Sequence, residues 1–244
     1  MEALHVRLDK LLANMGTGSR RDVKKLIAGR HVKVNGATVT DPGLEVSPES
    51  DEVTCRGERV QYKPFVYLMM NKPGGVLSCG DGAPGVKVCA DLVGDDYSFY
   101  ELSPAGRLDA DSEGLLILTN DGEFIHNIIS PNKKVKKTYY IRTLGELNEK
   151  DIEAFKEGLD IGNGEKAKSA ELEIIKSEKG ASEAIVRISE GKYHQVKRMV
   201  KACGKTVTYL KRISVGGVEL DPGLAPGEYR ELTDDELTKL KNKT

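Results

Sequence analysis

The stretch PAGRLDADSEGLLILTNDG, residues 104–122, decides the fold of the larger part of the chain. Its centre is an apolar run at residues 115–118, made of the aliphatic residues that fill a core strand, with Gly, Asp or Asn on either side. Just upstream, Arg107, Asp109 and Asp111 alternate along the chain, so in an extended backbone their side chains share one side. The stretch therefore predicts a buried strand with a carboxylate held beside it.

The composition is that of a globular protein with room for a core. The 244 residues are 39% hydrophobic and 31% charged, which indicates one or two domains. No apolar run approaches the ~20 residues of a membrane helix, and the start MEALHVRLDK lacks the apolar stretch of a signal peptide. We therefore expect a cytoplasmic protein with no membrane partner. The four Cys and four His residues are scattered, so we expect no metal site.

The charges are segregated along the chain, although the net charge is only -1. Residues 1–40 contain eight Lys or Arg and three acids, and residues 186–212 contain eight Lys or Arg and one acid. Residues 144–185 are acidic instead, with eleven acids and six bases. Two basic segments in a nearly neutral chain favour a protein that presents basic faces to a polyanion, with a merely solvated charged face as the alternative.

The N-terminal segment predicts a small module of two helices and a hairpin. Leu8, Leu11 and Leu12 recur at helical spacing, and Ser19 is placed to cap a second helix that ends at Gly29. Strands on either side of Asn35-Gly36 then predict a tight hairpin turn. The second helix carries four cations near its positive end, which we call the basic cluster: Arg20, Arg21, Lys24 and Lys25.

The segments RLDKLLANMG and SRRDVKKLIAGRHVKVNG resemble the alpha-L RNA-binding module first described in ribosomal small-subunit protein four. The resemblance covers roughly residues 5–55 and implies that this module docks on structured RNA. We expect an RNA-binding domain at residues 1–61, with the basic cluster and Lys33 as RNA contacts. The alternative is a basic mini-domain that only packs against its neighbour, but burying the basic cluster would require counter-charges that the helix lacks.

A second domain is expected at residues 65–244. Residues 65–70 predict an apolar strand and residues 71–76 a turn, in which Lys72 is expected to be a solvated lysine rather than an RNA contact. Residues 77–100 indicate only a loop and a short helix. Further on, alternating segments predict strands, and helices are expected at residues 122–129, at residues 148–158 and near the C-terminus. These patterns predict an α+β fold with a mixed, mostly antiparallel sheet and flanking helices.

Three motifs of the second domain resemble one enzyme family. Residues 106–122 resemble the signature GRLDxxTxGLLLLTNDG of the RsuA-type ribosomal RNA pseudouridine synthases, with Ser112 where that family usually has Thr. Lys137-Thr138-Tyr139 resembles its Lys-x-Tyr motif, and EGKYHQVKRM at residues 190–199 matches it almost letter for letter. The resemblance implies an isomerase of the pseudouridine synthase type. Its catalytic residues would be Asp109 as nucleophile, Tyr139 stacking on the target base, and Lys197 as the active-site cation. The expected substrate contacts are Arg107, His194, Gln195, Arg198 and Leu210.

The implied reaction suits the residue types at hand. Conversion of uridine to pseudouridine breaks the bond from sugar to base nitrogen and joins a ring carbon to the same sugar carbon, so nothing is oxidised or hydrolysed. We therefore expect no cofactor, and the sequence contains no dinucleotide fingerprint or P-loop. One ionised carboxylate is needed, and a nearby cation favours that charged form. Whether the aspartate adds to the sugar, adds to the ring or abstracts a sugar proton is left open by the sequence.

Several functions remain alternatives at this point. HQVKRM resembles the small-subunit enzyme more than the NREVRR-like variant of its large-subunit relatives, which favours 16S rRNA over 23S rRNA. The expected partner is ribosomal RNA within a pre-ribosomal particle, and the protein is expected to be a monomer. A non-catalytic, RNA-binding ribosome-assembly protein would need only the N-terminal module. A glycoside or nucleoside hydrolase would instead use Asp109 and Asp111 as a carboxylate pair.

Overall fold

The computed structural model describes residues 5–48, 50–61, 63–80, 86–94, 97 and 100–242. The chain divides into two compact units, Met1–Val66 with Val93–Glu101 and Tyr67–Leu92 with Leu102–Thr244. No helix within the described ranges is long and apolar enough to span a membrane.

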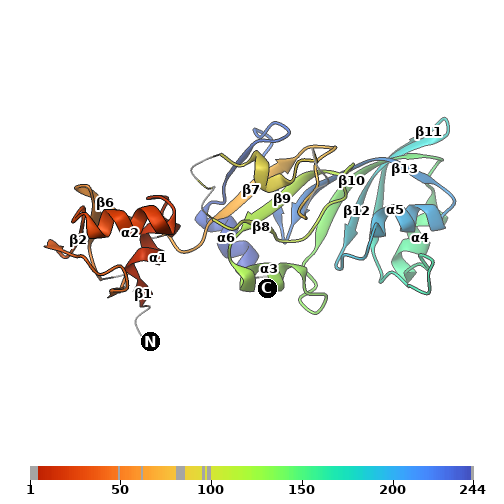
Figure 1. Cartoon of the computed structure of the whole chain (residues 1–244). Coiled ribbons are helices and arrows are strands. Elements are labelled where there is room, and N and C mark those ends of the chain that lie inside the picture. Colours follow the sequence, from red (N-terminus) through yellow and green to blue (C-terminus); the bar gives the residue numbers. More distant parts are fainter. Residues whose placement is uncertain are drawn as a thin grey trace. The chain divides into compact units, whose positions relative to one another are not determined.

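The first unit contains the helix pair that the leucine spacing predicts (Figure 1). Helix α1 (Leu8–Asn14) packs on α2 (Arg20–Ala28), and Ser19 caps α2 by accepting a hydrogen bond from the Asp22 amide. Leu8, Leu11 and Leu12 are buried, as expected from their spacing. The strands are β1 (Val6–Arg7) paired with β4 (Glu45–Val46), and a sheet in the order β3 (Ala37–Thr38), β2 (Val32–Val34), β5 (Val53–Cys55), β6 (Glu58–Arg59).

The predicted hairpin is present between β2 and β3. Asn35 and Gly36 form its turn with φ angles of 51° and 80°, the left-handed conformation that Asn and Gly tolerate best. The Asn35 side chain donates to the Asp51 carboxylate at 2.8 Å and accepts from the Glu52 amide at 2.9 Å. The turn is therefore fixed by side-chain contacts as well as by its backbone geometry.

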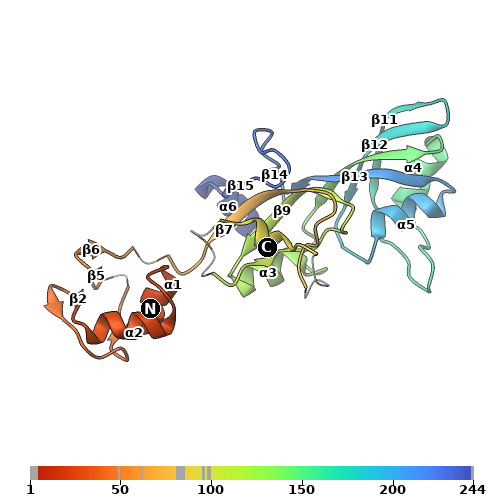
Figure 2. The same ribbon diagram turned by 45° about the horizontal axis from the view of Figure 1, so that its top comes forward.

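The second unit is built on one mixed sheet (Figure 2). Among the described residues it has nine strands, and only the pairing of β13 with β9 is parallel. The predicted mixed, mostly antiparallel sheet is confirmed. Seven strands lie side by side in the order β11 (Glu171–Glu178), β12 (Ala181–Ile188), β10 (Lys137–Leu144), β13 (Thr206–Val215), β9 (Glu113–Thr119), β7 (Tyr67–Lys72), β15 (Tyr229–Glu231). Two short strands are added to them: β14 (Val218–Glu219) pairs with β13, and β8 (Ser103–Pro104) pairs with β9.

Two pairs of helices complete two hydrophobic cores on this sheet. Helices α4 (Glu149–Glu157) and α5 (Gln195–Ala202) contribute Phe155 and Met199 to the core over β10, β12 and β13. Helices α3 (Gly122–Ile129) and α6 (Asp234–Lys241) contribute to the other core, over β7 and β9. The expected apolar run at residues 115–118 lies in β9 and is buried, so the central strand has the predicted role.

Gly114 permits the one parallel pairing among the described strands of the sheet. Its φ is 100°, and a Cβ atom placed on it would lie 2.2 Å from the carbonyl oxygen of Arg212. Any other residue would therefore push β9 away from β13 at the register pair Arg212 and Gly114. Gly114 thus allows β9, which follows the loop of Asp109, to pair with β13, which carries Leu210.

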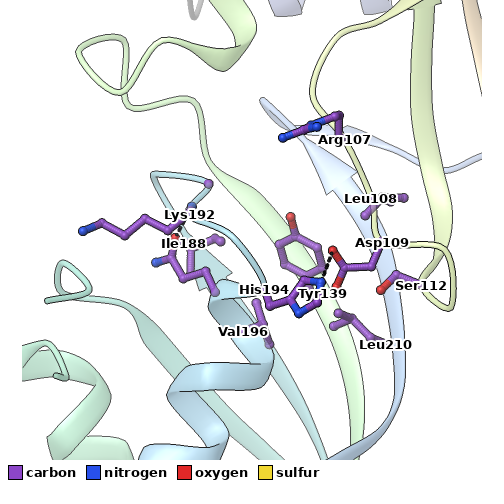
Figure 3. Close-up of a pocket in the computed structure, with 12 residues that line it drawn as sticks. Arg107, Leu108, Asp109, Ser112, Tyr139, Ile188, Lys192, His194, Val196 and Leu210 are labelled. Carbon is purple, nitrogen blue, oxygen red and sulfur yellow. Dashed lines mark hydrogen bonds and ion pairs between the residues drawn. The ribbon is translucent and has the colours of Figure 1, made fainter. Parts of the chain in front are cut away.

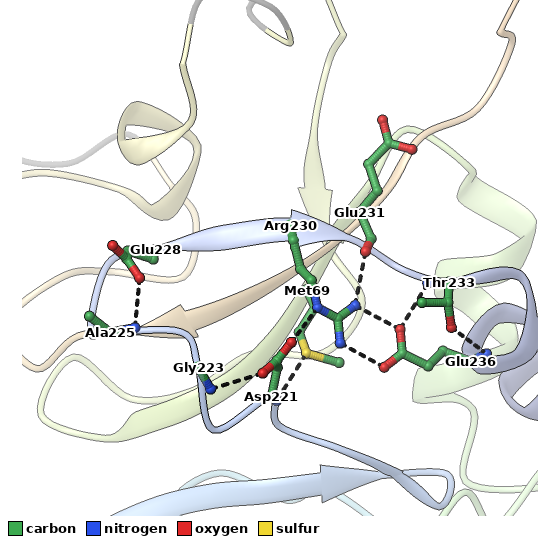
Figure 4. A network of polar contacts seen from close by, with 9 residues as sticks. All are labelled: Met69, Asp221, Gly223, Ala225, Glu228, Arg230, Glu231, Thr233 and Glu236. Carbon is green, nitrogen blue, oxygen red and sulfur yellow. Dashed lines mark hydrogen bonds and ion pairs between the residues drawn. The ribbon is translucent and has the colours of Figure 1, made fainter.

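The C-terminal segment is tied to the sheet by Arg230 of β15 (Figure 4). The Arg230 guanidinium donates to Asp221 at 2.6 Å and to both oxygens of Glu236 at 2.8 Å each. Glu236 is also the third residue of α6 and completes its capping box with Thr233. The hydrogen bond from Arg230 lowers the pKa of Glu236, so this bidentate pair stays ionised at neutral pH.

The predicted turn at residues 71–76 begins too early. Asn71 and Lys72 continue β7, pairing with Leu115 and Gly114 of β9, and Lys72 is fully buried instead of solvated. A lysine in a Pro-Gly-rich segment looks like a turn residue, because the sequence does not show the backbone carbonyl groups that satisfy its ammonium group. In the segment of residues 77–100, a short 3-10 helix runs over Cys89–Leu92, and residues 81–85, 95, 96, 98 and 99 lie outside the described residues.

Candidate active site

A pocket in the second unit brings together the three motifs that the sequence singles out (Figure 3). Its wall is formed by the loop before β9, by β10, by the segment from the end of β12 to the start of α5, and by β13. The lining residues are Arg107, Leu108, Asp109, Ser112, Tyr139, Ile188, Gly191, Lys192, His194, Gln195, Val196 and Leu210.

Asp109 lies in this wall with its carboxylate between two nitrogen-bearing side chains. Lys197 Nζ donates to Asp109 Oδ2 at 2.8 Å, and His194 Nε2 lies 3.4 Å from Asp109 Oδ1. The Asp109 side chain is 25% exposed, so one carboxylate remains open to a ligand while its charge is partly compensated. This is the pairing of one carboxylate with one cation that the implied chemistry needs.

Lys197 also holds Asp111, so its ammonium joins two carboxylates of the same loop. Its Nζ lies 2.6 Å from Asp111 Oδ1, and that hydrogen bond lowers the pKa of Asp111. Burial acts to lower the pKa of Lys197, but the hydrogen bonds to Asp109 and Asp111 outweigh it and raise that pKa above its ordinary value. Asp111 is 74% exposed and does not line the pocket, which distinguishes it from Asp109.

Hydrogen bonds from Lys72 hold the backbone of the loop that carries Asp109. The buried ammonium donates to the carbonyl oxygens of Pro73, Ala110 and Ser112 at 2.9, 3.1 and 2.8 Å. Burial lowers the pKa of Lys72, since these hydrogen-bond partners are neutral carbonyl groups rather than carboxylates. Lys72 therefore fixes the backbone on both sides of Asp111 and, through it, the position of the neighbouring Asp109.

A second anchor precedes Asp109. The Ser78 hydroxyl donates to the carbonyl oxygen of Leu108 at 2.7 Å and accepts from the Leu108 amide at 2.8 Å. Leu108 is buried in the same hydrophobic cluster as Tyr139 and Leu210. The loop is thus held on both sides of Asp109 by buried contacts.

Tyr139 and Leu210 form the apolar part of the wall. Both are buried, and they come from the neighbouring strands β10 and β13. In Figure 3 the Tyr139 ring lies beside Asp109, with its hydroxyl pointing toward the side of the pocket where Arg107 lies. An aromatic face and an aliphatic side chain next to a carboxylate are suited to holding a flat base.

His194 immediately precedes α5, Gln195 is the first residue of that helix, and both line the pocket. His194 has a φ of 50°, and this left-handed residue turns the chain so that the imidazole lies against Asp109. Gln195 is buried, and its amide donates to Glu190 at 2.8 Å while its oxygen accepts from the Lys192 amide at 2.9 Å. Gln195 therefore lines the pocket but uses its polar atoms to fix the loop at residues 190–195.

Arg198 is not brought to the pocket with the other expected substrate contacts. Its guanidinium donates to the carbonyl oxygens of Ile161 and Gly162 at 2.9 and 2.8 Å and pairs with Glu165 at 2.6 Å. One residue along a helix turns the side chain by about 100°, which separates Arg198 from Lys197. Its contacts fasten the loop of residues 161–165, so the expectation that it binds substrate finds no support in its position.

Three residues of the site are not identified by sequence reasoning. Lys72 looks like a turn lysine, Ser78 lies in a segment without a pattern, and Lys192 belongs to the motif EGKYHQVKRM without a role of its own. The position of Lys192, two residues before His194, could have identified it as a pocket residue. Nothing in the sequence identifies Ser78 as part of the site. Among the described residues, no three His, Cys, Asp or Glu side chains are grouped so as to hold a metal ion.

The expected RNA contacts of the first unit all face solvent. The basic cluster lies on α2, where residues 20, 21, 24 and 25 share one side of the helix, and each member is exposed. Lys33 is exposed in the middle of β2 between two buried valines. Lys25 has an acidic neighbour, Asp22, at 3.7 Å, so the positive charge of the cluster is only partly compensated.

Comparisons with known proteins agree with this fold. Residues 66–202 match the family model of RNA pseudouridylate synthase, and residues 6–53 match the model of the S4 domain. The first match covers more than half of the chain, so the chain belongs to the RNA pseudouridylate synthase family. It is an isomerase that acts on RNA, as the three motifs indicate.

Individual relatives cover nearly the whole chain. An uncharacterized RNA pseudouridine synthase of Bacillus subtilis is 48% identical over 95% of this chain and 97% of its own. Ribosomal small subunit pseudouridine synthase A of Escherichia coli is 36% identical over 96% of this chain and 100% of its own. Ribosomal large subunit pseudouridine synthase B of Bacillus subtilis is also 36% identical, over 96% and 95%. A crystal structure of a pseudouridylate synthase matches with a TM-score of 0.67 and 36% identity, covering 96% of this chain and 99% of its own.

Proposed function

We propose that this enzyme converts a specific uridine of ribosomal RNA into pseudouridine, and that its substrate is the 16S rRNA of the small subunit. Relatives named for ribosomal subunits support ribosomal RNA. The small-subunit and large-subunit relatives are equally similar, so overall similarity does not choose between them. The motif HQVKRM, which resembles the small-subunit enzyme, supports 16S rRNA over 23S rRNA.

We propose Asp109 as the nucleophile. The observation that carries this assignment is a carboxylate in the pocket wall, 2.8 Å from Lys197 Nζ and beside the Tyr139 ring. The reaction breaks the C1′–N1 bond, turns the uracil and joins C5 to C1′, while a proton is lost from C5 and N1 gains one. An ionised oxygen serves as nucleophile or base in that sequence, and the ammonium of Lys197 favours the ionised form.

The other pocket residues supply binding. We propose that the target uridine leaves the RNA stack and enters the pocket, where Tyr139 and Leu210 contact the two faces of the base. Arg107 is exposed at the pocket and provides a cation for the backbone of the extruded nucleotide. His194, at 3.4 Å from Asp109, is placed to contact the nucleotide beside the nucleophile.

The N-terminal module would position the enzyme on its RNA. We propose an RNA-binding domain at residues 1–61 and a catalytic domain at residues 65–244, with the basic cluster and Lys33 contacting phosphates. The exposure of these five cations and the match to the S4 domain support this assignment. We further propose that the protein acts in the cytoplasm as a monomer on a pre-ribosomal particle.

Two measurements test the proposal. Pseudouridine mapping in both ribosomal RNAs should show one site missing from the 16S rRNA of cells that lack the protein, and a missing 23S site would overturn the choice of subunit. Single-turnover assays should show that Asp109→Asn binds RNA but forms no pseudouridine. Asp111→Asn is the matched control, because it changes the other carboxylate on Lys197 and should be far milder. Appreciable turnover by Asp109→Asn would contradict the nucleophile, and release of free uracil would indicate a hydrolase.

A further inference from the structure

Tyr193 is an aromatic residue next to the active-site pocket that the proposed function does not use. The residue is 73% exposed, and its ring stacks on the imidazole of His194 with centroids 3.8 Å apart and planes inclined by 18°. His194 in turn lies 3.4 Å from Asp109. The two stacked rings therefore lead from the nucleophile out to solvent.

The loop that carries Tyr193 is fixed on both sides of it. Gln195 accepts a hydrogen bond from the Lys192 amide and donates to Glu190. Arg198 donates to the carbonyl oxygen of Tyr193 itself at 3.2 Å, and Lys192 Nζ donates to the carbonyl oxygen of Lys166 at 2.9 Å. The aromatic ring is thus presented by a backbone that is already ordered, which reduces the entropy lost when a ligand binds to it.

Packing does not account for this ring. Tyr193 belongs to none of the hydrophobic clusters formed by the described residues. One face of its ring contacts His194, and the high exposure leaves the other face to solvent. A flat aromatic face beside a nucleic-acid pocket is the feature on which unstacked bases bind.

We propose that the free face of Tyr193 is a second subsite, which stacks on a nucleobase next to the target uridine. When the uridine is extruded, its neighbour loses a stacking partner, and Tyr193 replaces that partner beside the pocket. The subsite rests on the proposed function in one respect, namely that the uridine enters the pocket of Asp109. Because every base has an aromatic face, the subsite should accept any base and add affinity more than sequence selectivity.

A double-mutant cycle on binding tests the subsite. The probe is a short single-stranded RNA with one uridine among adenosines, together with versions in which one adenosine at a time is replaced by an abasic nucleotide. The full chain with Asp109→Asn is used, so that the RNA is not converted during the measurement. Tyr193→Ala should weaken binding of the intact RNA by roughly five- to a hundredfold. Tyr193→Phe is the matched control, because it keeps the ring and should bind within about twofold of the parent.

The abasic series identifies the partner of the ring. At one position beside the uridine, removal of the base should weaken binding to the parent protein. With that RNA, the parent and the Tyr193→Ala variant should have the same affinity. If Tyr193→Ala binds the intact RNA like the parent, or loses the same affinity with every RNA of the series, the subsite is wrong. Either result would leave pseudouridine mapping unaffected. A failure of that mapping would equally leave this cycle interpretable, since it measures binding to a defined RNA.

Discussion

The buried ammonium of Lys72 lies 3.1 Å from the carbonyl oxygen of Ala110, the residue that follows Asp109. A second hydrogen bond, at 2.8 Å to the carbonyl oxygen of Ser112, closes the same loop from its other end. A charge on β7 therefore sets the path of the loop that presents the proposed nucleophile. The ammonium fits there because several backbone carbonyl groups replace its lost water, although burial lowers its pKa.

Replacing Lys72 by Met should impair both the fold and the reaction. The methionine fills the space but leaves the carbonyl oxygens of Ala110 and Ser112 without their donor, at a cost of about 1–3 kcal/mol in the free energy of unfolding. We expect a single-turnover rate lower by about ten- to a hundredfold, because Asp109 loses its fixed position. Urea unfolding and single-turnover assays measure the two effects. Lys133→Met, at an exposed position, should alter neither, and wild-type activity in Lys72→Met would show that the loop is held by other interactions.

Lys197→Met should slow the reaction. Removing the ammonium costs about two to three powers of ten in rate. In the wild type the lowered pKa of Asp111 and the raised pKa of Lys197 keep the ion pair between these two residues intact at neutral pH. Without the lysine, the carboxylates of Asp109 and Asp111 lose the cation that they share and repel each other. Single-turnover assays at saturating RNA measure the slower rate, and a wild-type rate in Lys197→Met would show that the ammonium does not support the reaction.

The Asp111 carboxylate offers a control for this explanation. In the double variant Lys197→Met with Asp111→Asn, the like charge beside Asp109 is gone, so part of the lost rate should return. If the double variant is as slow as Lys197→Met alone, repulsion between the carboxylates is not the cause.

The elements of this site were easier to predict from the sequence than the interactions between them. The apolar run of β9 and the alternation of β10 were sufficient to place buried strands, because period and composition report burial directly. Asp109 and Lys197 lie 88 residues apart, and only the resemblance of their motifs to one family brought them together. The solvated lysine predicted at position 72 was wrong, and the structural hydrogen bonds of Gln195 and Arg198 were not foreseen, for a common reason. Polar side chains that satisfy buried backbone groups look the same in a sequence as polar side chains that bind a ligand.

The buried Lys137 should make the free energy of unfolding depend on pH in the alkaline range. Burial, with repulsion from Arg212, lowers the pKa of Lys137 from 10.5 to about 8. Between about pH 8 and 10.5 the unfolded chain binds the proton and the folded chain does not, so this lysine makes the fold more stable as the pH rises. The free energy of unfolding is measured for the wild type and for Lys137→Met at each pH. We expect the wild type to gain about 3 kcal/mol relative to the variant from pH 7 to pH 10.5. The hydrogen bonds from Lys137 to the carbonyl oxygens of Ile128 and Val135 are absent from the variant at every pH, and a constant difference would show that Lys137 titrates normally.

The basic cluster on α2 should account for much of the salt dependence of RNA binding. Each cation removed from the phosphates of a structured RNA reduces the slope of log affinity against log salt by about 0.9. Neutralising all four members to Gln or Met should therefore flatten the slope by up to about 3.6 and weaken binding at low salt, while the single-turnover rate at saturating RNA stays near that of the wild type. The matched control removes the same charge from exposed positions in the acidic part of the chain, at Lys150, Lys156, Lys176 and Lys179. Equal slopes for the two quadruple variants would mean that only net charge matters, and the N-terminal module would then not be the surface that docks on RNA.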